Sequence, residues 1–204
     1  MLRFVSGPSL MLRLRRHLLS TVATLSVIGA CAPAAPTPAP VAPRTVYLVR
    51  HAEKGTEPAK DPPLTNAGKA RAQALSVALG DAGVRSILTT QLLRTRETGR
   101  PLAERLGITA QVVGVTGAAR EHAADVARAV RAQPSGAVLV VGHSNTVPLI
   151  IEALGGPAMP AICDAAYANL YVVQLWGDGK VTLARTEYGA RSPDDATCGG
   201  MTPR

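Results

Sequence analysis

Two short apolar runs in this chain each end on a histidine. Residues 45–49 are followed by Arg50 and His51, and residues 138–141 are followed by a glycine and His143. Runs of consecutive aliphatic and β-branched residues are typical of strands buried on both faces of a parallel sheet. Residues that follow such strands lie at the carboxyl edge of the sheet, where open α/β sheets bind their ligands. We therefore expect both histidines at one edge of one sheet.

A third segment, residues 89–98, adds a second arginine. Arg94 lies at the junction of a predicted strand and a predicted helix. From there it can reach the same sheet edge, close to a helix amino end that itself favours anions. Arginine matches phosphate oxygens with its fork of N–H donors. Arg50, Arg94, His51 and His143 together predict a binding site for a dianion such as phosphate.

The remaining pattern alternates strands with helices. Strands are predicted at residues 45–49, 86–89, 109–113 and 137–141, and helices at about 64–79, 95–106, 121–133 and 146–154. Two alternating segments, 169–175 and 180–186, predict a closing hairpin. This order predicts an α/β fold, a three-layer α/β/α sandwich with a mostly parallel central sheet.

Composition excludes a nucleic-acid role. The chain has 204 residues, 47% of them hydrophobic and only 3% aromatic, and a formal net charge of +8. The first 30 residues hold four arginines and no acid, which leaves 18 basic and 14 acidic residues in the rest. Basic residues are not interleaved with aromatic ones, as a nucleic-acid surface requires. The length fits one domain with a tail.

Residues 1–30 are predicted to be a targeting segment. A cluster of arginines precedes an apolar run at 18–30, which is shorter than the roughly 20 residues needed to span a bilayer. Small residues directly before Cys31 resemble a bacterial lipobox, which predicts lipidation of Cys31 and a membrane anchor at the bacterial cell envelope, on the periplasmic side or the cell surface. An ordinary signal peptide is the alternative, and Met11 is an alternative start.

The organisation predicted for the rest of the chain has three parts. Residues 31–43 form a Pro/Ala-rich tether, 44–190 form the domain, and 191–204 form a C-terminal tail. Export implies an oxidising compartment, so Cys163 and Cys198 are candidates for a disulfide. Two unpaired thiols are an equally weighted alternative.

Four motifs, in this order and spacing, resemble those of the histidine phosphatase (phosphoglycerate mutase-like) superfamily, in its small bacterial branch. They are Val49–Glu53, Leu64–Ala72, Leu92–Thr98 and Val140–Thr146. The resemblance covers nearly all of residues 44–190. It implies a phosphoglycerate mutase-like fold and a metal-independent phosphatase without a cofactor, here in an exported lipoprotein form.

The resemblance also implies a role for each residue of the predicted anion site. His51 is the nucleophile, which attacks phosphorus to form a phosphohistidine that water then hydrolyses. Arg50, Arg94 and His143 bind the phosphoryl oxygens and stabilise the charge of the transition state.

The proton donor for the leaving group is left open. Many relatives carry an acid between the second arginine and the second histidine motif, where this chain has Glu121 and Asp125. Glu121 is the candidate donor, with a solvated residue of a helix first turn as the alternative. Glu53 and Asp61 are rivals. Small relatives that hydrolyse phosphoramidates lack a dedicated acid.

Two other readings of the same residues fail. A zinc site at His51 and His143 lacks a third ligand, and Arg50 would repel the cation. A serine hydrolase at Ser144 lacks the glycine that a nucleophile elbow needs after the serine. The lone His122 is interpreted as a surface or satisfied core residue.

The sequence therefore predicts a phosphatase at the cell envelope. Its substrate would be a phosphorylated small molecule or a phosphohistidine, that is, a phosphomonoester or a phosphoramidate. A catalytically weak anion-binding lipoprotein with the same pocket is the alternative.

Overall fold

The computed structural model describes residues 42–192. The predicted signal segment, most of the tether and most of the tail lie outside this range, as do Cys31 and Cys198. The expectations that concern them, lipidation included, stay predictions. Within the described range, no helix combines the length and the apolar character that crossing a membrane requires.

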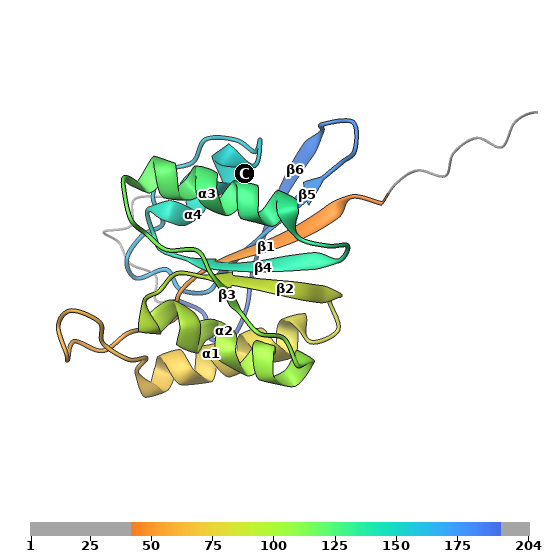
Figure 1. Ribbon diagram of the computed structural model, residues 1–204. Helices are drawn as coiled ribbons and strands as arrows, with labels where there is room; N and C mark the ends of the chain where they lie inside the picture. The colour runs from red at the N-terminus through yellow and green to blue at the C-terminus, as the bar shows by residue number, and fades with distance from the viewer. Residues whose placement is uncertain (1–41, 193–204) are drawn as a thin grey trace, which may run out of the picture. The chain divides into compact units, whose positions relative to one another are not determined.

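A six-stranded sheet forms the centre of the domain (Figure 1). Its strands are β1 (Arg44–Arg50), β2 (Val84–Thr89), β3 (Gln111–Val112), β4 (Ala137–Gly142), β5 (Asn169–Leu175) and β6 (Val181–Glu187). The order across the sheet is β3-β2-β4-β1-β5-β6. The first four strands in this order are parallel, and the β5–β6 hairpin continues the sheet in the antiparallel sense. The predicted mostly parallel sheet is thus confirmed.

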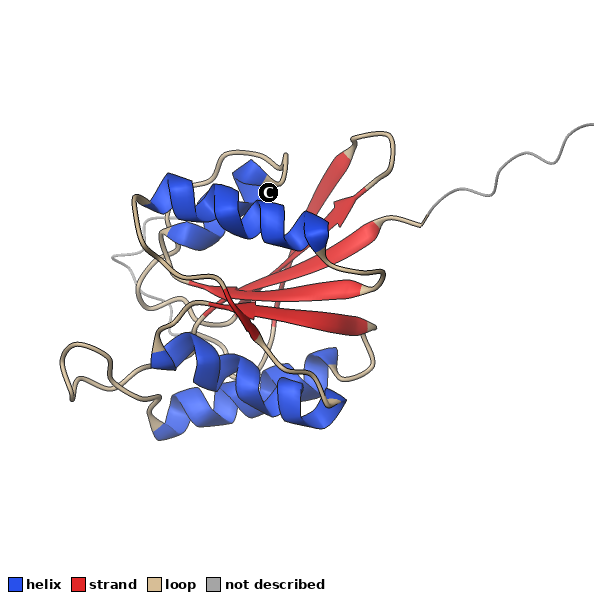
Figure 2. Ribbon diagram, viewed as in Figure 1, coloured by secondary structure: helices blue, strands red, loops and turns tan. Residues whose placement is uncertain are grey.

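Helices cover both faces of the sheet (Figure 2). One face carries α1 (Asn66–Leu79) and α2 (Leu93–Leu106), and the other carries α3 (Ala119–Ala132) and α4 (Thr146–Ala153). Each face has its own cluster of buried aliphatic side chains, because the sheet between them is apolar on both sides. The predicted three-layer α/β/α sandwich is therefore confirmed.

Most elements begin or end within one or two residues of their predicted bounds, and the third strand is shortened the most. The strand predicted at 109–113 reduces to Gln111–Val112, an exposed edge strand that has a neighbour only on one side. Helix α3 begins at Ala119 instead of 121, because the Glu121 carboxylate accepts a hydrogen bond from the Ala118 N–H and so caps the extra residues. Shifts of this size are common at element ends.

The start of α1 is held against the loop that follows β1. Thr65 caps the helix, its hydroxyl accepting from the Gly68 N–H at 3.1 Å. A side chain at Gly68 would collide with the backbone carbonyl of Glu53, so glycine is required there by the close approach of two backbones. The motif that contains these residues therefore fixes the course of the chain beyond His51.

Candidate active site

The pairing of β1 with β4 brings the two histidines together. Arg50 lies opposite Gly142 in this parallel pair, and the His51 N–H donates to the Gly142 carbonyl at 2.9 Å. The residues that follow the two strands, His51 after β1 and His143 after β4, therefore leave the sheet at the same edge. Their ring centroids are 5.4 Å apart. The expected common edge is what the structure shows.

The backbone of the next residue holds His51 in one tautomer. Its Nδ1 lies 2.8 Å from the Ala52 carbonyl oxygen. Because a carbonyl only accepts, Nδ1 carries the hydrogen and Nε2 carries the lone pair. Burial lowers the pKa of His51 to about 4, against the Ala52 hydrogen bond and with a further lowering by Arg50. At neutral pH the ring is therefore uncharged, which is the form a nucleophile needs.

A hydroxyl relay fixes the tautomer of His143. The Thr95 hydroxyl donates its single hydrogen to a backbone carbonyl, that of Leu92 at 2.8 Å or of Thr90 at 3.1 Å. The Thr90 hydroxyl, 2.9 Å from that of Thr95, must then donate to it. It accepts in turn from His143 Nε2 at 3.2 Å. The hydrogen of neutral His143 thus lies on Nε2, which leaves the lone pair on Nδ1.

His143 is also uncharged at neutral pH. Burial, followed by the nearby rings and guanidinium groups of His51 and Arg94, lowers its pKa to about 3. Two neutral rings lie side by side, and the two arginines beside them supply the positive charge of the site. A phosphoryl dianion bound there would face cations on its arginine side and a lone pair on His143.

A clamp from a distant segment holds Arg50. Its Nη1 donates to the carbonyls of Cys163 and Asp164 at 2.9 and 2.7 Å. Its Nη2 donates to the Asp164 carboxylate at 3.2 Å and to the Tyr167 hydroxyl at 3.4 Å, and the guanidinium carbon lies 4.2 Å from the Tyr167 ring centroid. Its Nε is buried and has no hydrogen-bond partner among the described residues. A bound phosphoryl oxygen is the kind of acceptor that this N–H lacks.

The segment that clamps Arg50 includes a bonded cysteine. Cys163 is in a disulfide. The sequence nominated Cys198 as its partner, and because Cys198 lies outside the described residues, that pairing stays a prediction. No sequence motif pointed to this segment as the support of Arg50, which lies more than 110 positions earlier in the chain.

Arg94 is held less tightly. Its Nη1 lies 3.7 Å from the Asp61 carboxylate, and its buried Nε has no partner among the described residues. Burial lowers the pKa of Arg94, partly offset by Asp61. Both Asp61 carboxylate oxygens also accept from the Leu93 N–H at 3.0 Å, in the first turn of α2. Asp61 therefore orients Arg94 and the helix that carries it.

A cavity of about 420 Å³ opens over these groups. Among the residues that line it are all four predicted phosphate-site residues: Arg50, His51, Arg94 and His143. The structure thus brings together, in one cavity, the residues that the sequence assigned to one site. An exposed Lys54 and Asp164 lie at its rim, and Leu92 and Val115 give it an apolar side.

None of the acids nominated as proton donor lines this cavity. Glu53 forms a tight ion pair with Arg71, at 2.8 to 3.0 Å. Glu121 is exposed, and its carboxylate accepts from the Ala118 N–H at 3.2 Å. These contacts are structural ones. Of the described residues that line the cavity, Asp164 is the only acid; sequence reasoning missed it because it looked for acids before the second histidine motif.

Two further residues, Gln91 and His122, shape the apolar wall. The Gln91 side-chain amide accepts from the Val115 N–H at 2.9 Å and donates to its carbonyl at 3.3 Å, as a neighbouring strand would. Next to it, the buried His122 donates from Nδ1 to the Gly114 carbonyl at 3.2 Å. His122 is thus a core residue, as one of its two predicted placements has it, although its Nε2 finds no partner among residues 42–192.

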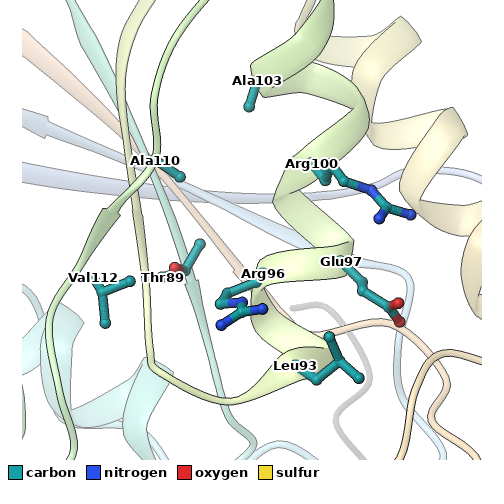
Figure 3. A pocket seen from close by; sticks show the side chains of 8 residues that line it. All are labelled: Thr89, Leu93, Arg96, Glu97, Arg100, Ala103, Ala110 and Val112. Carbon is teal, nitrogen blue, oxygen red and sulfur yellow. The ribbon is translucent and has the colours of Figure 1, made fainter.

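A second cavity, of about 290 Å³, lies between α2 and β3 (Figure 3). It is lined by Arg96, Thr89 and Val112, among others, and by no histidine. An α-helix turns about 100° per residue, so Arg94 and Arg96 point to nearly opposite sides of α2. The two arginines therefore line different cavities, and of these two only the cavity of Arg94 is lined by histidines. Across residues 42–192, no three His, Cys, Asp or Glu side chains group so as to hold a metal ion.

Comparison with known proteins gives one family match. The model of the histidine phosphatase superfamily (branch 1) matches residues 46–114, a range that includes Arg50, His51 and Arg94. No curated protein matches the chain. The likeness to the histidine phosphatase superfamily is thus established for residues 46–114.

Solved structures show the same fold. A structure of the protein histidine phosphatase SixA complexed with tungstate is 20% identical, with a TM-score of 0.54 over 70% of this chain and 96% of that one. A mycobacterial glucosyl-3-phosphoglycerate phosphatase in complex with inorganic phosphate is 17% identical, with a TM-score of 0.53 over 72% and 98%. Mycobacterial hydrolase 1 is 16% identical, with a TM-score of 0.55 over 74% and 100%. At these identities the likeness concerns the fold.

Proposed function

We propose that this protein is a histidine phosphatase, which hydrolyses a phosphomonoester or a phosphoramidate through a phosphohistidine on His51, at the bacterial cell envelope. The family match supports phosphatase activity. Both substrate classes stay within the proposal, because one structural neighbour is a protein histidine phosphatase and another is a glucosyl-3-phosphoglycerate phosphatase.

One observation carries the proposal: the Nδ1–H of His51 is committed to the Ala52 carbonyl at 2.8 Å. This leaves the Nε2 lone pair as the reactive atom, on a neutral ring in the cavity that Arg50 and Arg94 line. A nucleophile next to two cationic oxyanion binders is the arrangement that phosphoryl transfer requires.

The reaction has two balanced steps. The Nε2 lone pair forms an N–P bond while the bond from phosphorus to the leaving oxygen or nitrogen breaks, and the leaving atom keeps the electron pair and takes up a proton. A water oxygen then attacks phosphorus, the N–P bond breaks, and inorganic phosphate leaves with His51 restored. Arg50 and Arg94 balance the charge on the phosphoryl oxygens in both steps. Metal independence is part of the proposal, and activity in a chelator tests it.

Acid-labile, base-stable ³²P incorporation tests the intermediate. The protein is mixed with a ³²P-labelled aryl phosphate, quenched within milliseconds in alkali and mapped by mass spectrometry. Label on His51 in the wild type, and none in His51→Ala, is the expected result. Phosphate binding without any label or turnover would contradict the enzyme and favour the anion-binding lipoprotein.

The envelope location depends on Cys31. A diacylglycerol on its thiol, joined to the domain by the Pro/Ala-rich tether, would hold the active site near a membrane surface. The native protein should then incorporate palmitate and resist salt extraction. Cys31→Ser should be released in soluble form with unchanged kcat, because the anchor is remote from the cavity. A soluble cytoplasmic protein with residues 1–30 intact would refute this part.

A further inference from the structure

Asp164 occupies an unusual place in the cavity. Its carboxylate lies 3.2 Å from Nη2 of Arg50, and its side chain is 92% exposed. Its backbone carbonyl, in contrast, accepts from Nη1 of the same arginine at 2.7 Å. The carbonyl is enough to hold Asp164 beside Arg50. The carboxylate is therefore not needed to hold Arg50 in place. It adds a negative charge to a predicted phosphate site.

Charge counting shows where this carboxylate acts. A phosphoryl dianion balances the two guanidinium charges of Arg50 and Arg94. Apart from the floor groups around the phosphoryl group, the charged residues of the cavity lining are Lys54 and Asp164. In-line attack by the buried His51 would place the leaving group on the far side of phosphorus, away from the ring. A leaving group that points out of the cavity would come near the exposed Lys54 and Asp164.

We propose that Asp164 is a specificity-determining residue, which favours substrates with a cationic leaving group over substrates that carry a second anion. The matching class is the phosphate esters of amino alcohols, whose ammonium group would pair with the carboxylate. This inference rests on the proposed phosphatase function. Asp164 also weakens phosphate binding, because its carboxylate competes with phosphoryl oxygens for Nη2 of Arg50.

The expected effect is moderate because the carboxylate is solvated. Two charges several ångströms apart at a protein surface interact weakly, and salt screens them further. Removing the charge should change each affinity by about three- to tenfold. Asn in place of Asp keeps an oxygen that accepts from Arg50, so the clamp and the fold should persist.

The test uses three phosphate esters that differ in the charge of the leaving group: phosphoethanolamine, ethyl phosphate and phosphoglycolate. Asp164→Asn should lower kcat/KM for the cationic ester and raise it for the anionic one, with ethyl phosphate changed least. Lys54→Met should shift the ratio of the two in the opposite direction. Asp178→Asn, the same charge change in the β5–β6 turn at the opposite sheet edge, should leave the ratio unchanged.

Binding of inorganic phosphate separates this inference from the proposed function. By calorimetry, Asp164→Asn should bind phosphate about three- to tenfold more tightly than the wild type, whether or not any ester is hydrolysed. If none of the three esters is hydrolysed but phosphate binds as expected, the proposed activity fails and the role of Asp164 at the site stands. An unchanged ester ratio together with an unchanged phosphate affinity overturns the inference.

Discussion

The floor of the active-site cavity and its rim are built in different ways. On the floor, Arg50, His51 and His143 are 5%, 4% and 9% exposed, and backbone carbonyls or hydroxyls fix the orientation of each. At the rim, Lys54 and Asp164 are exposed and project from loops. Preorganised groups in a site shielded from water act strongly, whereas solvated charges act weakly. The floor should therefore set the chemistry and the rim the choice among substrates.

The largest effect should come from removing the nucleophile. His51→Ala should lower turnover of an aryl phosphate by more than about a hundredfold, because the loss of the attacking group costs several kcal/mol of transition-state stabilisation. Steady-state kinetics measures the loss, and circular dichroism checks that the fold is retained. Residual activity above about a hundredth of the wild type would show that another group attacks phosphorus.

Arg94 and Arg96 offer a matched pair, two residues apart on α2. Arg94→Ala should weaken inhibition by phosphate or vanadate by about 10- to 100-fold, since hydrogen bonds to charged groups contribute about 1.5–3 kcal/mol. Arg96→Ala removes the same charge from the second cavity and should change inhibition by less than about twofold. Equal effects would mean that the anion responds to overall charge and not to the cavity floor.

The sequence was sufficient to predict the floor because topology alone brings its residues together. Two histidines after two buried strands, and one arginine after a third, must meet when those strands are parallel neighbours. The supports of these residues could not be predicted in the same way. The clamp on Arg50 comes from residues 163–167, which have no periodic pattern and reach the site only through the course of a long loop.

The sequence did not predict which acidic residue lies at the cavity. The sequence offered Glu121, Glu53 and Asp61 as proton donors, and the structure binds the three to Ala118, Arg71 and the start of α2, respectively. Which acid faces a cavity depends on loop conformation, for which one sequence holds little information. Asp164 lines the cavity because of the conformation of the loop that carries it.

A pH-dependent affinity should distinguish His143 from a passive wall residue. Its pKa of about 3 leaves it neutral above that pH, with a lone pair on Nδ1. A bound dianion needs a donor there, so binding should raise the pKa of His143 and take up a proton. Affinity for sulfate, a dianion throughout this range, should fall by up to about tenfold per unit as the pH rises from 5 to 8. Calorimetry in two buffers counts the protons, and an affinity independent of pH would contradict the relay through Thr90.

Glu121→Gln should have the smallest effect on catalysis and tests whether an acid outside the cavity lining donates the proton. A general acid contributes about 10²–10⁴-fold for a poor leaving group and little for a good one such as nitrophenolate. Because the Glu121 carboxylate caps α3 and does not line the cavity, the change should lower activity on alkyl and nitrophenyl phosphates equally, by less than about threefold.

The same variant should be slightly less stable than the wild type, because a charged acceptor is lost at the amino end of α3, where negative charge is favourable. Thermal unfolding measures this change, and the two substrates measure catalysis. A selective loss on the alkyl phosphate would assign the proton donor to Glu121 after all. It would also require the first turn of α3 to move toward His51 when substrate binds, so that a group outside the cavity of the free protein would take part in the chemistry.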